Sequence, residues 1–75
     1  MALTPTELAT RFSYHSPKGD QPERYNAIRS KGQELALLLD GLCPESRELS
    51  LAMTNLEQAL FWANAAIARR TPADG

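Results

Sequence analysis

The chain has 75 residues, a formal net charge of -1 and a single cysteine. A chain this short has only a marginal hydrophobic core, which is usually supplemented by disulfides, a metal or oligomerisation. Cys43 is alone, so an intrachain disulfide is excluded, and Cys43 with His15 supplies too few ligands for zinc. We therefore expect no metal, no cofactor and a homo-oligomer.

Charge and hydropathy exclude two further classes of protein. The near-neutral total argues against DNA binding, which depends on a basic surface. No apolar run approaches 18 residues, so we expect no transmembrane helix. With no signal-peptide pattern and one cysteine, we expect a protein of the reducing cytoplasm.

The first expected element is a short helix within residues 1–13. It opens at "TPTEL", where Thr4 can cap the helix, Pro5 suits its first position and Glu7 completes a capping box. We expect it to end near residues 11–14. The segment 14–20 contains Pro17 and Gly19, which predict a loop.

The second expected element is a helix over residues 21–42. Asp20 is its expected N-cap, and Gly41 with Pro44 predicts its end. Apolar or small residues recur at helical spacing along one stripe: Ile28, Gly32, Leu35, Leu39 and Leu42. A glycine within such a stripe is unfavourable for the helix, and we interpret Gly32 as a point where another backbone approaches closely.

The third expected element is a helix over residues 45–70, with residues 71–75 as a frayed tail. Its stripe continues without a break through Leu49, Met53, Leu56, Leu60, Ala63 and Ile67. The short connection makes the two long helices antiparallel. The fold class is therefore all-α: a single domain over residues 1–75, with a short helix before an antiparallel two-helix hairpin.

A second apolar set on the third helix indicates an interface. Two helices bury one stripe each and leave these residues uncovered: Ala52, Ala59, Phe61, Trp62, Ala65 and Ala66. Leu37 and Leu38 widen the face of the second helix in the same way. An apolar patch of this kind marks a protein interface, so the hairpin is expected to be half of the folded unit, or less.

Residues 11–31 concentrate the features that could bind a ligand. They hold three of the five aromatic residues, the only histidine and five of the eight basic residues against two acidic ones, a local charge of +3. Tyr14 lies in the loop among cations and is a candidate platform for stacking a nucleobase. Phe12 either covers the open end of the hairpin or joins the same site. A small anionic ligand suits this local charge better than a long polyanion.

The candidate phosphate contacts are basic side chains around the start of the second helix. Arg29 lies one turn beyond Tyr25 on the same face and can hold phosphate oxygens with two N–H groups. Lys18 and Lys31 are point charges in the same region, although each alone is more often a solvated side chain. Arg69 and Arg70 at the end of the third helix either stabilise its C-terminus or reach a ligand. Asn64, on an apolar face, either sets the register between chains or reaches a ligand.

The evidence for catalysis is weak. His15 could act as a general acid or base, but as a lone histidine it is better interpreted as structural or as a hydrogen-bonding group for a ligand. No Ser-His-Asp set or carboxylate pair accompanies it, and "PKGD" lacks the frame of a phosphate-binding P-loop. We therefore expect a protein that is not an enzyme.

Three stretches together resemble a known family: "YHSPKGDQPERY", "SREL" and "FWANAAIAR". Over residues 11–70 the chain resembles the phage anti-CBASS cyclic-nucleotide sponges, whose hairpin is related to that of the anti-Thoeris sponges. The resemblance implies a compact homohexamer in the host bacterial cytoplasm. It also implies sequestration, without cleavage, of cyclic dinucleotides such as 3′,3′-cyclic GMP–AMP, which keeps a bacterial immune effector from being triggered.

Carried onto this chain, the resemblance assigns base stacking to Tyr14 and phosphate contact to Arg29, with Lys18 and Lys31 as further cations. It also implies that ligands lie in pockets shared between protomers. Some members hold cyclic trinucleotides in separate pockets near a three-fold axis. For such a pocket, Arg69 or Arg70 is the terminal cation to consider, although the ending "RRTPADG" is not part of the resemblance.

Two other interpretations remain open. The chain could be a helical adaptor or regulatory subunit with no nucleotide ligand, which explains the apolar stripes but not the cluster in residues 11–31. It could also be a cyclic-nucleotide phosphodiesterase that uses His15. One hairpin alone is expected to lack a cavity of several hundred cubic ångströms, so assembly would have to build the binding site.

Overall fold

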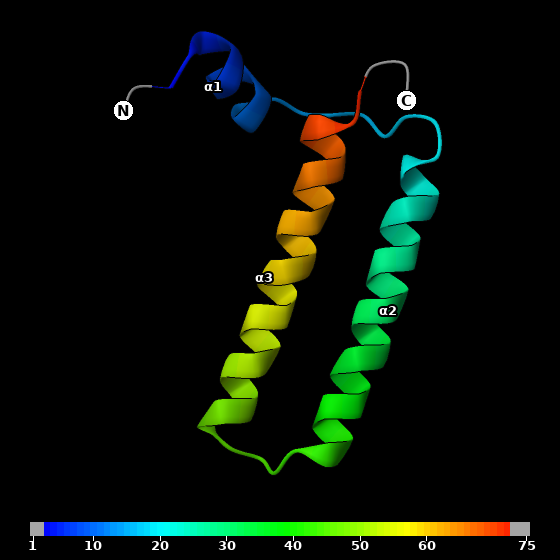
Figure 1. Cartoon of the computed structure of the whole chain (residues 1–75), viewed down its shortest axis with the longest axis vertical. Helices are drawn as coiled ribbons and strands as arrows, with labels where there is room; N and C mark the ends of the chain where they lie inside the picture. The colour runs from blue at the N-terminus through cyan, green and yellow to red at the C-terminus, as the bar shows by residue number, and fades with distance from the viewer. Residues whose placement is uncertain (1–2, 73–75) are drawn as a thin grey trace.

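The computed structural model describes residues 3–72, and three α-helices make up the regular structure of this part. They are α1 (Pro5–Phe12), α2 (Gln21–Leu42) and α3 (Arg47–Arg70). Helices α2 and α3 lie side by side and antiparallel, and α1 lies at the end of the hairpin where α3 finishes and α2 begins (Figure 1). The all-α class is confirmed, and no strand occurs between residues 3 and 72.

Side-chain caps begin two of the helices. The Thr4 hydroxyl accepts from the Glu7 amide at 3.0 Å, and the Ser46 hydroxyl accepts from the Leu49 amide at 3.1 Å. The cap expected from Asp20 is absent, because its carboxylate instead accepts from the Arg24 guanidinium at 2.8 Å. This charge-assisted bond, one turn along the helix, lowers the pKa of Asp20.

Helix α2 spans the expected residues, whereas α3 begins later than expected. Helix α2 ends at Leu42, and the extended Cys43 closes it by donating its amide to the Leu39 carbonyl at 2.9 Å. Helix α3 begins at Arg47 rather than residue 45, because Ser46 is extended and acts as the cap. Residues 73–75 of the expected tail lie outside the described residues.

The apolar stripe of α3 faces α2 as predicted, whereas that of α2 faces α3 only in part. Every member of the α3 stripe is half-buried. On α2, Gly32 is buried and Ile28 and Leu39 are half-buried, but Leu35 is 42% exposed and Leu42 is 73% exposed. Ala36, half-buried, takes the place expected for Leu35.

Gly32 is buried because it receives a side chain of the partner helix, which corrects the expectation of a close backbone. A Cβ at this position would overlap the Leu60 methyl groups. The two helices are therefore fitted together at one point by a leucine on α3 and a glycine on α2.

The hairpin has little interior. Within residues 3–72 no hydrophobic side chain is fully buried, and the buried polar residue is Gln21, at 6% exposure. Large apolar side chains remain exposed on both long helices: Leu37, Leu38, Leu42, Leu51, Phe61 and Trp62. Across the same residues, none of the helices combines the length and the apolar character that crossing a bilayer requires.

Candidate ligand-binding cleft

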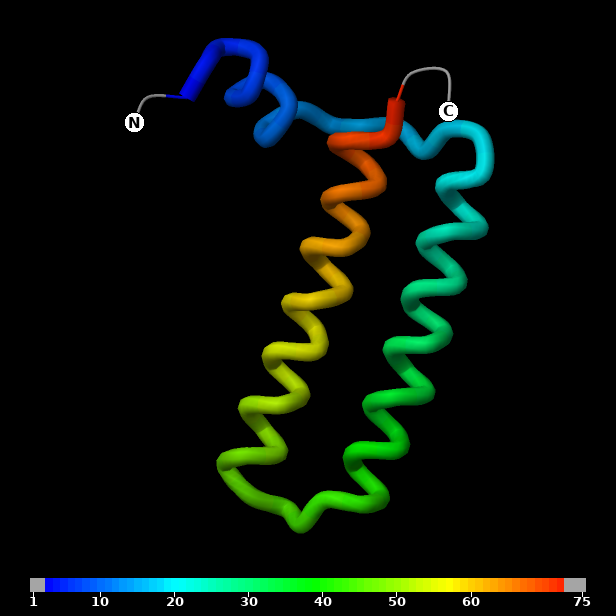
Figure 2. Tube along the Cα trace, viewed as in Figure 1, coloured from blue at the N-terminus to red at the C-terminus, as the bar shows by residue number. Residues whose placement is uncertain are grey.

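An open cleft of about 390 Å³ lies where the loop between α1 and α2 meets the long helices. Its lining comes from all three segments: Arg11, Ser13, Tyr14, His15, Tyr25, Arg29, Phe61, Asn64, Ala65, Ala68 and Arg69. The expectation that one hairpin lacks a cavity of this size was therefore wrong. Residues 13–20 cross the end of α3 on their way to α2 (Figure 2), and Ser13, Tyr14 and His15 of this loop line the cleft together with residues of the long helices.

Gln21 holds this loop in place. Its side-chain oxygen accepts from the Lys18 amide at 2.9 Å, and its side-chain nitrogen donates to the Ile67 carbonyl in the last turns of α3 at 3.1 Å. Gly19, at φ 55, provides the left-handed turn that brings the loop into α2. The loop is thus fixed to α2 and α3 by a buried side chain that satisfies two backbone groups.

Tyr14 and Arg29 line the same cleft, as the sequence predicts. Tyr14 is 85% exposed, so its ring has a face free to stack. Arg29 donates to the side-chain oxygen of Asn26 at 2.7 Å through one terminal nitrogen, and its remaining N–H groups are available for an anion. An aromatic surface and a guanidinium therefore border one space.

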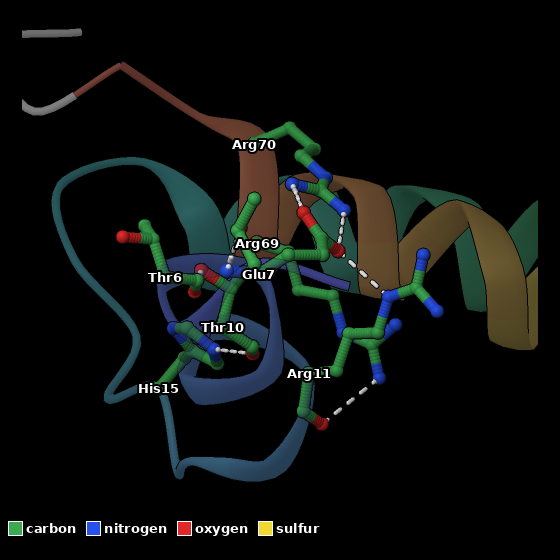
Figure 3. Close-up of polar contacts among 8 residues, drawn as sticks. Thr6, Glu7, Thr10, Arg11, His15, Arg69 and Arg70 are labelled. Carbon is green, nitrogen blue, oxygen red and sulfur yellow. Dashed lines mark hydrogen bonds and ion pairs between the residues drawn. The ribbon is translucent and has the colours of Figure 1, made fainter. Parts of the chain in front are cut away.

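His15 reaches the cleft but also has a structural bond. Its Nε2 lies 2.7 Å from the Thr10 carbonyl, so this nitrogen carries the proton and donates (Figure 3). The bond fixes the loop to the end of α1. Only Nδ1 is left for a ligand, and among the described residues no carboxylate is bonded to the ring. The contacts favour the structural or hydrogen-bonding interpretation over catalysis.

The two candidate lysines lie apart from each other. Lys18 borders a smaller cavity of about 220 Å³ together with Tyr14 and His15. Lys31 is not in the lining of either space; its ammonium lies 3.1 Å from the Glu34 carboxylate, and its side chain is 81% exposed. Lys18 is therefore placed near the site, whereas Lys31 is not.

A second groove, of about 510 Å³, lies between α1 and the end of α3, and it contains the remaining candidates. Arg11, Arg69 and Arg70 border it together with Phe12 and Trp62. Phe12 is 83% exposed and does not cover the open end of the hairpin. Arg69 borders both the groove and the cleft, so the two spaces adjoin.

Two polar residues at these sites carry no clear signal in the sequence, and a third, Asn64, was a candidate whose place the sequence left open. Gln21 follows the expected cap, where a glutamine has no special meaning. Glu7 was assigned only to a capping box, yet its carboxylate bonds to arginines. Asn64 borders the cleft, and its side-chain oxygen is buried without a hydrogen-bond partner within residues 3–72. Each depends on contacts between segments far apart in the chain, which local spacing cannot reveal.

Together these features define a small helical binding protein whose two adjoining hollows each combine exposed rings with cations. Residues 4–68 match the family model described as "Acb2/Tad1, hairpin domain", and the chain belongs to this family. The family comprises the anti-CBASS and anti-Thoeris sponge proteins, which are phage proteins that bind cyclic nucleotides. No curated protein and no solved structure matches the chain significantly.

Proposed function

We propose that this protein binds cyclic dinucleotides such as 3′,3′-cyclic GMP–AMP and sequesters them without cleavage in the host bacterial cytoplasm. The observation that carries the proposal is the cleft, in which the exposed ring of Tyr14 and the guanidinium of Arg29 border one space. A cyclic dinucleotide presents flat bases and two phosphodiesters, which suit a stacking ring and a cation respectively.

Self-association is part of the proposal. The cleft of one hairpin is open, and a ring that is 85% exposed covers a base from one side only. The exposed apolar side chains of α2 and α3 are available to bind further copies of the chain. We propose a homo-oligomer, for which the family resemblance implies a hexamer, with the cleft closed by a neighbouring protomer. Slow release from such a closed site would suit a sponge.

Cyclic trinucleotides are a second candidate ligand class, for the groove at Arg69 and Arg70. The specific observation is that three arginines and two exposed rings border one space of about 510 Å³. A ligand with three phosphodiesters matches this number of cations. Because the groove adjoins the cleft without coinciding with it, both ligands could bind at once.

Titration calorimetry with 3′,3′-cyclic GMP–AMP tests the main proposal, on protein whose mass is checked by light scattering. We expect Tyr14→Ala to lose about 5- to 150-fold in affinity, the equivalent of removing one base–ring stack. Tyr14→Phe is the matched control, because it keeps the ring and should retain most of the affinity. Both variants should keep the wild-type mass, since the Tyr14 side chain is exposed.

The same experiment separates the rival interpretations. An adaptor with no nucleotide ligand would give no heat with the wild-type protein, and Tyr14→Ala would then change nothing. A phosphodiesterase that uses His15 would convert the ligand during prolonged incubation. Recovery of intact ligand after denaturation and chromatography would exclude this activity, whereas a linear product would refute sequestration.

A further inference from the structure

The carboxylate of Glu7 is clamped by two of the arginines that border the second groove. Its two oxygens accept from the two terminal nitrogens of Arg70, at 3.0 and 2.8 Å, and one of them also accepts from Nε of Arg11 at 2.7 Å (Figure 3). These bonds connect the first turn of α1 to the last turn of α3, 63 residues away in sequence. A guanidinium that holds two oxygens in this way has the geometry used for carboxylates and phosphates alike.

The groove beside this carboxylate is suited to an aromatic anion. Phe12 and Trp62 are 83% and 58% exposed, and Ala65 and Ala66 leave room between them. The third arginine, Arg69, makes only a 3.5 Å contact to the Arg11 carbonyl and so keeps donors for a ligand. Three arginines against one carboxylate leave an excess of two positive charges around the groove.

We propose that Glu7 is a specificity-determining residue of this groove: its carboxylate occupies Nε of Arg11 and both terminal nitrogens of Arg70, donors that a phosphodiester would otherwise use. This inference rests on the proposed function for the class of ligand. A ligand must displace the carboxylate to reach these donors, which exchanges one set of charge-assisted bonds for another. A lone phosphate therefore gains little net binding free energy from this exchange. A ligand with several phosphodiesters and stacked bases makes additional contacts with Arg69 and the two rings.

A purely structural role for Glu7 predicts the opposite change in ligand affinity when the carboxylate is removed. If the carboxylate served only to hold α1 against α3, its removal would loosen Phe12 and Arg11, which form the α1 side of the groove. Ligand binding would then weaken. If the carboxylate competes with the ligand, its removal strengthens binding. The direction of the change thus distinguishes the two roles.

The test is calorimetric titration of the full chain with cyclic tri-adenylate, which carries three phosphodiesters, and separately with 3′,3′-cyclic GMP–AMP. We expect Glu7→Gln to bind the trinucleotide about two- to fivefold more tightly than wild type, the range of an exposed ion pair, and to change the dinucleotide affinity less, because Arg11 borders both spaces whereas Arg70 borders the groove and not the cleft. Glu45→Gln is the matched control, because it makes the same change of charge in the connection between α2 and α3, at the opposite end of the hairpin (Figure 1). It should match wild type with both ligands.

Glu7→Asp provides a second variant that keeps the charge on α1. Its carboxylate is one methylene shorter and should not span to Arg70 as well, so its affinity for the trinucleotide should lie between those of wild type and Glu7→Gln. Unchanged or weaker trinucleotide binding in Glu7→Gln, at wild-type mass and helix content, overturns the inference. So does the absence of trinucleotide binding by both proteins while dinucleotide binding persists. If the wild-type protein binds neither ligand, the proposed function itself fails.

Discussion

The contact between Gly32 and Leu60 makes opposite predictions for two glycines of the same helix. In an exposed helix, replacing glycine with alanine stabilises by up to about 1 kcal/mol, because alanine loses less backbone entropy on folding. At Gly41, a Cβ would meet nothing within 4 Å, so Gly41→Ala should approach this gain. At Gly32, the same change places a methyl group in the space of the Leu60 side chain.

The loss of stability expected for Gly32→Ala depends on which atoms must move to admit the new methyl group. The atoms in the way are the methyl ends of a leucine rather than backbone, so Leu60 can rotate, but it then leaves its fitted position against α2. Overpacking of this kind costs about 1–3 kcal/mol, which outweighs the gain in helix propensity. We expect Gly32→Ala to be destabilised by up to about 2 kcal/mol in the free energy of unfolding.

Urea unfolding followed by circular dichroism measures both variants. All samples must be at one protein concentration, because the stability of the proposed oligomer would depend on that concentration. Adding Leu60→Ala to Gly32→Ala removes the obstructing methyl groups, so the two costs should be less than additive. If Gly32→Ala were as stabilising as Gly41→Ala, the fit of Leu60 against Gly32 would be refuted.

Two further predictions concern the polar contacts. Gln21→Leu should lower the free energy of unfolding by about 1–3 kcal/mol, because the two hydrogen bonds that hold the loop against α2 and α3 are lost, at about 0.5–1.5 kcal/mol each, whereas the exposed Gln58→Leu should stay within about 0.5 kcal/mol of wild type; equal urea midpoints would contradict the role of Gln21. Hydrogen bonds from its two arginine partners lower the pKa of Glu7 from 4.5 to about 2, so its stabilising contribution is complete above about pH 4.5 and is lost as the pH falls towards 2. An NMR titration of the Glu7 carboxyl carbon should therefore show a midpoint near pH 2, and a midpoint near 4.5 would show that the contacts do not persist in solution.

The helices were predictable because their signals are local. The bounds of α2, the cap at Thr4 and the inward stripe of α3 follow from residue types at helical spacing, and the structure agrees with them. The cap expected from Asp20 was wrong for an equally local reason, because Arg24 one turn later competes for the same carboxylate. The role of Gly32 could not be predicted from α2 alone, since the position of Leu60 on α3 explains why a glycine is needed there.

The candidate site was predictable only in part, because half of its lining comes from the far end of the chain. The cluster in residues 11–31 correctly indicated that Tyr14 and Arg29 would lie together. Spacing within that cluster could not show that Lys31 would pair with Glu34 instead. Nor could it show that Asn64 and Arg69 would border the same cleft, because this depends on how the loop crosses α3.

The small interior of the hairpin and the openness of its cleft point to a common explanation. A chain without a fully buried hydrophobic side chain in residues 3–72 gains little free energy from folding alone, and the proposed association would supply further apolar contact. Phe61 belongs both to the exposed apolar surface and to the cleft, because its ring is 61% exposed and borders the cleft. It lies beside Trp62 in an edge-to-face contact at 5.3 Å. A neighbouring protomer that covered these rings would bury apolar surface and close the mouth of the cleft in the same step. Assembly and ligand binding should therefore stabilise each other, since each buries a surface next to the one that the other requires.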